Sequence, residues 1–124
     1  MLANLKLHPV LAAVDIERAR RWYAEKLDLH PIKDNQGELI YEVAGERFLM
    51  YETPSAGTAK NTVAGWDVDD LDAVMADLRQ RGVVFEEYDY PEFKTVNGVV
   101  NFGDSRGAWF KDSEGNIFSL NESH

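Results

Sequence analysis

The sequence predicts an α+β fold built from two tandem βαβββ units, and two observations support this prediction. First, the order of one strand, one helix and three strands occurs twice along the 124 residues. Second, the two halves align. Asp15 matches Asp69 at an offset of 54 residues. Nearer the end of each half, Gly45 matches Gly115 at an offset of 70. Two copies indicate a duplicated supersecondary unit, because a solenoid needs more repeats. We expect one domain over 1–124, with unit one at 1–57 and unit two at 58–124.

The first unit begins with an apolar, β-leaning run over 5–14, which predicts a strand. Asp15 follows at the position of a helix N-cap, because its carboxylate can accept the free N–H groups of the first turn. Apolar residues at steps of three and four from Ile16 to Leu27 then predict an amphipathic helix. Three strands are expected after it, at 29–33, 39–43 and 47–52, with turns at 35–37 and 44–45.

Small residues with a Pro and a Gly, over 53–59, are typical of a linker. The pattern then restarts with a strand at 62–68, and Asp69 or Asp70 caps the next helix. An apolar stripe that begins at Leu71 predicts this helix, which ends at a Gly after a basic last turn. The remaining strands are expected at 83–87, 99–102, 108–111 and 117–121.

The second unit carries 16 residues more than the first, and the excess falls within 88–105. This segment mixes aromatic and acidic residues with Gly, and a loop of that length is typical of a lid, a binding loop or a dimer contact. Tyr90 and Phe93 are candidate contacts to a ligand, and packing against a second copy is the equal alternative.

The composition excludes several classes of function. The chain has 13 Lys and Arg residues against 22 Asp and Glu, a net charge of −9, which disfavours nucleic acids and anionic membranes as partners. No segment approaches the roughly 18 apolar residues of a membrane-spanning helix. The absence of Cys removes disulfides, thiolate nucleophiles and zinc–thiolate sites, and agrees with a reducing compartment. We therefore expect a cytoplasmic protein that binds neither nucleic acid nor membrane.

Two segments resemble the vicinal oxygen chelate superfamily, which contains glyoxalase I, bleomycin resistance proteins, fosfomycin resistance proteins and extradiol dioxygenases. VDIERARRWYAEKL, at 14–27, resembles its helix-opening segment, and WFKDSEGNIFSL, at 109–120, resembles its closing hairpin. The chain departs from the family at Asp28, where Gly is usual, and at Ser113, where Pro is usual. The resemblance covers essentially the whole chain and implies curved mixed sheets around a ligand cavity, with the helices outside.

In metal-dependent members, four residues on the first and last strands of the two units hold the ion. The resemblance places these positions at His8, Thr62, Ser119 and Leu49, or at Met50 if the register slips by one. Among them only His8 is an ordinary metal ligand, and one imidazole with two hydroxyls and an aliphatic side chain offers too few donors for a divalent ion. Glu52 would join His8 only in the Met50 register. We therefore expect no metal and no cofactor.

Alternation along the strands predicts which side chains line the implied cavity. Trp66 is expected to share a face with Thr62, Tyr51 with Leu49, and Asn121 with Ser119. The candidate ligand-binding residues are His8, Tyr51, Thr62, Trp66, Ser119 and Asn121. Trp66 and Tyr51 can stack on a flat ligand or hold a cation through their rings, so a small aromatic or cationic organic molecule is the expected partner. The alternative is that His8 and the aromatic residues only pack the structure.

The leading hypothesis is a metal-free protein of this superfamily that binds or sequesters a small molecule, similar to the bleomycin resistance branch. A homodimer is expected, because neither unit can bury both faces of its sheet alone. The alternative is a lyase, isomerase or dioxygenase, either with an atypical metal site such as His8 with Glu52, or with His8 as acid and base. A regulatory module with a vestigial cavity is a third hypothesis. No catalytic residue beyond the candidate His8 is indicated.

Overall fold

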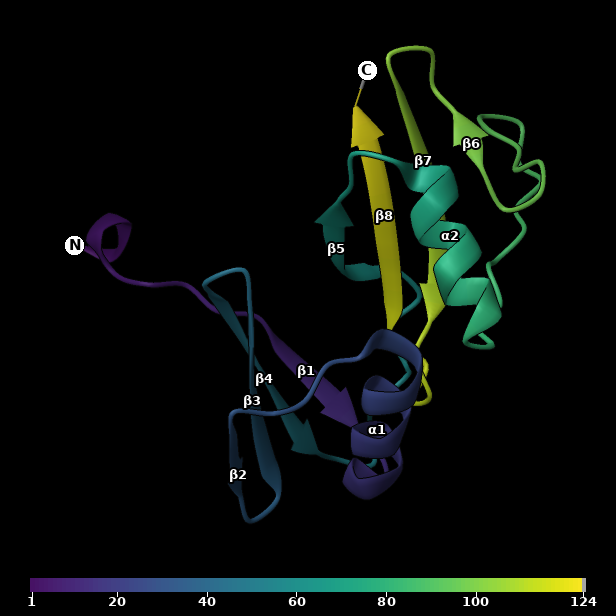
Figure 1. Ribbon diagram of the computed structural model, residues 1–124. Coiled ribbons are helices and arrows are strands. Elements are labelled where there is room, and N and C mark those ends of the chain that lie inside the picture. The colour runs from purple at the N-terminus through teal and green to yellow at the C-terminus, as the bar shows by residue number, and fades with distance from the viewer. Residues whose placement is uncertain (124) are drawn as a thin grey trace.

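The computed structural model describes residues 1–123, so His124, the last residue of the expected unit two, lies outside the described residues. The first half of the chain contains β1 (Val10–Ala13), α1 (Ile16–Trp22), β2 (Lys33–Asn35), β3 (Glu38–Val43) and β4 (Glu46–Glu52). The second half contains β5 (Thr62–Asp67), α2 (Leu71–Gln80), β6 (Val100–Asn101), β7 (Ser105–Lys111) and β8 (Ile117–Ser123). The order βαβββ therefore occurs twice, as predicted (Figure 1).

Each half forms its own four-stranded mixed sheet. The strand order is β1-β4-β3-β2 in the first sheet and β5-β8-β7-β6 in the second, which is the same pattern. In both sheets the first and last strands of the unit pair in parallel, and the other pairs are antiparallel. The predicted α+β fold with two tandem units is confirmed.

The helices begin and end where their capping residues predict. The Asp15 carboxylate accepts the N–H of Arg18 at 3.0 Å, and Asp70, not Asp69, caps α2 by accepting the N–H of Ala73 at 3.1 Å. After α1, a π-helical turn (Tyr23–Leu27) continues the helix and ends at Asp28, with φ at 54°. Asp28 therefore adopts the left-handed conformation that Gly would take most easily, and an Asp tolerates it at some cost.

Two expected strands differ from the structure. The segment 83–87 forms no strand and contributes only one isolated bridge, between Phe85 and Phe110. The fourth strand of the second sheet is instead β6, which pairs with β7 after the long loop. In the first sheet, β2 begins at Lys33, where the strand expected at 29–33 ends. In the second unit the segment after the helix therefore touches β7 at Phe85, and a ladder with β7 forms only at β6.

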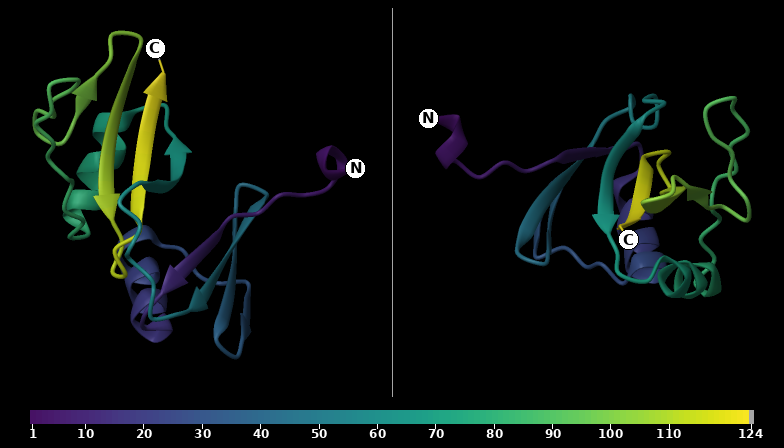
Figure 2. Two further views of the ribbon diagram at one scale, coloured as in Figure 1. Left: turned by 180° about the vertical axis from the view of Figure 1, so that it is seen from behind. Right: turned by 90° about the horizontal axis from the view of Figure 1, so that it is seen from above.

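The core lies where α1 and α2 pack against one side of both sheets (Figure 2). Tyr23, at the end of α1, is fully buried between the sheets. Its ring centroid lies 6.3 Å from that of Phe48 in the first sheet and 6.3 Å from that of Phe118 in the second. Phe48 and Phe118 occupy matching positions of the two units, so the repeat places one aromatic ring from each sheet against the same helix.

The hairpin between β7 and β8 binds the start of α1 through buried polar groups. The Glu114 carboxylate accepts the N–H groups of Val14 and Asp15 at 2.9 Å each, and it pairs with Arg18 at 2.8 Å. Beside it, the buried Tyr23 hydroxyl donates to Asp112 at 2.5 Å. Burial, followed by the charge of Asp112, raises the pKa of Tyr23 well above its usual value. These contacts join the second unit to the helix of the first.

We expect Tyr41→Phe to raise the free energy of unfolding by about 1 kcal/mol, because burying an unpaired hydroxyl is unfavourable. The Tyr41 ring is buried against Phe48, and its hydroxyl has no hydrogen-bond partner among the described residues. Urea unfolding measures the change. Tyr23→Phe is the matched control, since it removes a hydroxyl that donates to a carboxylate and should cost about 2 kcal/mol. A similar loss in both variants would contradict the prediction.

Residues 1–8, the N-terminal arm, leave the body of the protein ahead of β1 and extend away from both sheets (Figures 1 and 2). The arm contains a short 3-10 helix (Leu2–Asn4). Four apolar side chains of the arm, at Met1, Leu2, Leu5 and Leu7, are between 63% and 98% exposed. Across residues 1–123, no helix combines the length and the apolar composition that crossing a lipid bilayer requires.

Candidate functional site

Each sheet has one face against α1 and α2 and another, its open face, turned away from them. On the open face of the second sheet, cross-strand pairing arranges the side chains of β7, β8 and β5 in rows. The middle row is Trp109, Ser119 and Gly65, and the next is Gly107, Asn121 and Asp67. Thr62 pairs with Ile117 in the row on the other side. Thr62, Ser119 and Asn121, three of the predicted ligand-binding residues, therefore share one face.

A hydroxyl and an amide occupy the centre of this face. The Asn121 side-chain NH₂ donates to the Ser119 hydroxyl at 3.1 Å. Glycines flank the pair, and a Cβ added to Gly65 would collide with the Ser119 hydroxyl, while one added to Gly107 would lie 3.6 Å from the Asn121 carbonyl. The side-chain oxygen of Asn121, Oδ1, accepts no hydrogen bond from any residue within 1–123, so it is available to a ligand; the backbone carbonyl of Asn121 accepts the N–H of Val68 at 2.8 Å.

Aromatic side chains border this polar pair. Phe93 stacks on Trp109 with centroids 5.7 Å apart, and Tyr88 meets Trp109 edge-on at 5.6 Å. Phe102 lies 3.8 Å from the Cβ position of Gly107, beside Asn121. We call the set the aromatic wall; it consists of Tyr88, Tyr90, Phe93, Phe102 and Trp109. The long loop of the second unit therefore folds back onto the open face of its own sheet.

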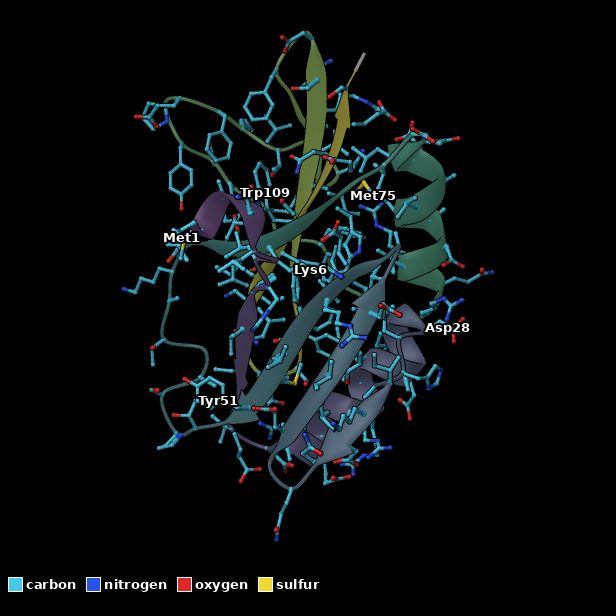
Figure 3. All side chains as sticks on the ribbon, turned by 90° about the vertical axis from the view of Figure 1, so that its left-hand side faces the viewer. Met1, Lys6, Asp28, Tyr51, Met75 and Trp109 are labelled. Carbon is cyan, nitrogen blue, oxygen red and sulfur yellow. The ribbon has the colours of Figure 1, made fainter. Side chains whose placement is uncertain are left out.

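The open face of the first sheet is more apolar. Val10 pairs with Leu49 and Ala12 with Tyr51, so these four side chains lie together, and Tyr51 is 44% exposed. His8 lies two residues before Val10 at the end of the arm and is exposed. Tyr51 and Trp109 both project away from the side on which α1 and α2 lie (Figure 3). The candidate residues of the chain thus divide between two open faces that belong to separate sheets.

The prediction that Trp66 shares a face with Thr62 is wrong. Thr62 pairs with Ile117, but the register shifts after it, so that Ala64 pairs with Phe118 and Trp66 with Leu120. A one-residue irregularity of this kind turns every later side chain to the opposite face. Trp66 therefore lies on the helix side, with its ring 5.2 Å from Phe118.

Trp66 borders a cavity of about 470 Å³ between the two sheets, the intersheet cavity. Its apolar lining comes from both sheets: Pro9, Leu11, Val43, Phe48, Ala64, Trp66 and Phe118. Glu46, Arg47 and Asp67 lie among the lining residues as the charged groups. Trp66 and Asn121 point to opposite faces of the second sheet. Gly65 and Asp67, which stand in the rows of Ser119 and Asn121, also line the cavity, so it reaches the β5 edge beside this pair.

Sequence reasoning missed Trp109, Tyr88 and Phe102 as neighbours of the polar pair. The alternation along β7 contains a usable signal for Trp109, which lies directly opposite Ser119. No signal of that kind places Tyr88 and Phe102, because they belong to the loop and approach the sheet through tertiary packing.

The residues at the positions that hold a metal in related proteins do not fit a divalent ion. Leu49 lies on the open face and Met50 is fully buried on the other, so the aliphatic residue stands at the fourth position. Glu52 shares the face of Met50, and its carboxylate accepts the N–H of Ile16 at 3.1 Å. Within residues 1–123, no three His, Asp or Glu side chains come together as a metal site. One imidazole and two hydroxyls remain as donors, and the alkyl group of Leu49 offers none.

Comparisons with known proteins agree with this architecture. A family model described as Glyoxalase/Bleomycin resistance protein/Dioxygenase superfamily matches residues 7–120. UcmS2 superposes with a TM-score of 0.76 at 22% identity, covering 96% of this chain and 98% of its own. A glyoxalase/bleomycin resistance protein from Catenulispora acidiphila gives 0.68 at 22%, covering 98% and 100%.

The fosfomycin resistance protein FosX from Listeria monocytogenes, in complex with Mn(II) and sulfate, superposes with a TM-score of 0.72 at 16% identity. The superposition covers 100% of this chain and 93% of FosX. No curated protein matches the chain. At these identities the solved structures establish a shared fold.

Proposed function

The chain belongs to the Glyoxalase/Bleomycin resistance protein/Dioxygenase superfamily, and from this premise we propose that it binds or sequesters a small organic molecule without a metal ion. The observation that carries the proposal is the Ser119–Asn121 pair, a hydroxyl and an amide held between two glycines and bordered by the aromatic wall. A small-molecule site is usually lined by apolar side chains with a few polar groups that point towards the ligand.

The chemistry of the wall supports a flat aromatic ligand, and a cationic one in particular. Its five rings offer stacking faces, and ring faces attract cations. Asp67 stands in the same row as Asn121, and the whole chain carries a net charge of −9. A positively charged aromatic molecule is therefore favoured by both the local and the overall charge.

We further propose a homodimer in which the open face of the first sheet covers the open face of the partner's second sheet. The first sheet leaves Val10 and Tyr51 about half exposed, although they are apolar or aromatic. Covering them with a second copy would remove this surface from water and enclose the polar pair between two sheets. His8, Tyr51, Thr62, Ser119 and Asn121 would then line one cavity. The lack of Cys and the acidic charge are the grounds on which we propose a cytoplasmic location.

We expect proflavine, a planar aromatic cation, to bind more tightly than the planar anion 1-anilinonaphthalene-8-sulfonate. Fluorescence titration measures both affinities. Trp109→Ala and Asn121→Ala should each weaken proflavine binding about 5- to 30-fold, the effect of losing roughly 1 to 2 kcal/mol of stacking or hydrogen bonding. Val84→Ala, an exposed apolar change elsewhere, is the control. Unchanged binding in both site variants, or no binding of either dye, would reject the proposed site.

We expect elemental analysis of protein purified without chelator to find less than stoichiometric Mn, Fe and Zn. Isothermal titration with Mn(II) should likewise show no saturable binding at micromolar concentration, because the donor set is too poor for a divalent ion. His8→Ala is the matched variant and should behave as the wild type. Tight stoichiometric binding that His8→Ala abolishes would reject the metal-free proposal and favour an enzyme with a rebuilt ligand set.

A further inference from the structure

The N-terminal arm is an apolar segment that its own chain leaves uncovered. Leu7 is 91% exposed and Leu5 63% exposed. The backbone hydrogen bonds of residues 1–8 that involve described residues stay inside the arm, from Asn4 to Met1 and from Leu5 to Leu2. Exposed apolar side chains that gather in one short segment are typical of a surface that contacts another molecule.

The intersheet cavity has the composition that such an arm requires. Its interior is apolar and includes Leu11, Phe48 and Trp66. Glu46 and Asp67, on its border, are exposed and take part in no ion pair with another described residue. The remaining charged lining residue, Arg47, already pairs with Glu42 at 3.4 Å. The cavity therefore presents an apolar interior with two free carboxylates at its border.

The charge of the arm is complementary to this border. Lys6 forms no ion pair within residues 1–123, and it lies between Leu5 and Leu7. In extended chain, side chains alternate between two sides, so Leu5 and Leu7 point one way and Lys6 the other. When the two Leu side chains enter an apolar cavity, the ammonium group is left at its border.

The arm cannot fill the cavity of its own chain. Pro9 lines the cavity, and the arm begins directly before Pro9 and runs outward from the body (Figures 1 and 2). A second copy related by a two-fold axis removes this restriction, because each arm can then enter the cavity of the other chain. Such an exchange is reciprocal, so it closes at two chains.

We propose that residues 1–7 of the arm insert into the intersheet cavity of a second copy of this chain, while His8, at the base of the arm, stays beside the open face of its own first sheet. Leu5 and Leu7 pack beside Trp66, and Lys6 pairs with Glu46 and Asp67 of the partner. The proposal rests on the homodimer proposed above and adds which segment is exchanged and where it binds. It also assigns Trp66 a role in assembly, apart from the Ser119–Asn121 site.

Cysteine cross-linking tests the placement directly, because the chain has no Cys of its own. Lys6→Cys chains and Asp67→Cys chains, the latter with an affinity tag that changes their mass, are co-expressed and oxidised. A disulfide requires Cα atoms within about 7 Å, so the mixed dimer reports contact between arm and partner cavity. Val84→Cys, at a side chain 77% exposed and outside the cavity lining, replaces Asp67→Cys in the control.

The expected result is a mixed disulfide dimer in at least about fivefold greater yield than with Val84→Cys. A yield equal to the control overturns the arm placement. If sedimentation still shows a dimer, the homodimer of the proposed function stands and only the arm is misplaced; a monomer overturns both. Proflavine binding by the wild type and by Trp109→Ala, both with Asp67 intact, reports on the Ser119–Asn121 site separately, so the two failures are distinguishable.

Charge exchange provides an independent measurement on the intact chain. Lys6→Glu should raise the dimer dissociation constant about 10-fold, because it places a third carboxylate beside Glu46 and Asp67. Adding Asp67→Lys should restore the constant to within about threefold of the wild type. Neither substitution alters a buried residue. No change in Lys6→Glu, or no restoration in the double variant, overturns the proposed pairing.

Discussion

Glu114→Gln is expected to lower the free energy of unfolding by about 2 kcal/mol at pH 7, because a buried carboxylate that accepts two backbone N–H groups and the half-exposed Arg18 guanidinium loses its charge. The Glu114 side chain is fully buried and receives the N–H groups of Val14 and Asp15 together with the Arg18 guanidinium. A neutral amide keeps the shape but loses the charge that these donors bind. Urea unfolding at pH 7 measures the loss.

The same group predicts a pH dependence. Burial alone would raise the pKa of Glu114, but the hydrogen bonds from Arg18, the Asp15 backbone and Ser113 together lower it to about 2. Because the folded pKa lies below that of the unfolded chain, the carboxylate stabilises the fold fully above about pH 4.5. This contribution disappears as pH falls from about 4.5 towards 2. The stability difference between wild type and Glu114→Gln should therefore shrink over that range.

Glu25→Gln is the matched control, because Glu25 is exposed and the change removes the same charge. Glu25→Gln should alter the free energy of unfolding by less than about 0.5 kcal/mol. Its difference from the wild type should be the same at pH 7 and at pH 3.5. Equal effects in the two variants, or a Glu114→Gln difference that grows at low pH, would show that the buried carboxylate does not stabilise the joint between the hairpin and α1.

Gly57→Ala is expected to cost about 3 kcal/mol or more, whereas Gly37→Ala should cost about 1 kcal/mol. Both glycines have nearly the same left-handed backbone, with φ at 76° and 78°, so an added Cβ strains both equally. They differ in their surroundings. A Cβ on Gly57 would collide with the backbone carbonyl of Glu114, and one on Gly37 would meet nothing within 4 Å.

Comparing Gly57→Ala with Gly37→Ala therefore distinguishes two causes of lost stability: strain in the backbone, which both variants share, and a clash between the linker and the hairpin, which only Gly57→Ala introduces. Gly57 approaches Gly115 so closely that a Cβ on Gly115 would lie 3.0 Å from the Gly57 Cα. Thermal and urea unfolding of the two Ala variants give the comparison. Equal losses would mean that the linker moves aside and that its contact with the hairpin adds nothing to stability.

Much of the fold was predictable because its determinants are local. Asp15 caps a helix by accepting an N–H three residues away, and Gly45 turns a hairpin through its left-handed φ of 83°. The repeat then extends each local pattern to the second half. The strand expected at 83–87 is not formed, for the opposite reason. Val83 and Phe85 are buried and Val84 is exposed, an alternation typical of a strand, but the segment makes only one isolated bridge, from Phe85 to Phe110 of β7.

The candidate site was predictable only in part. Ser119 and Asn121 share a face because they are two residues apart on an uninterrupted strand, and alternation alone places them together. The aromatic wall depends on a long loop that returns to the sheet, and nothing local specifies that return.

The sequence by itself determined the duplicated architecture, the caps and turns, and the chemical types of the side chains at each strand position. Only the tertiary structure decided which faces those side chains occupy after Thr62, and which residues from distant segments meet on them. The physical reason is that alternation holds only along an unbroken ladder. One irregularity between Thr62 and Ala64 reverses the face of Trp66, and it moves this residue from the polar pair to the cavity between the sheets.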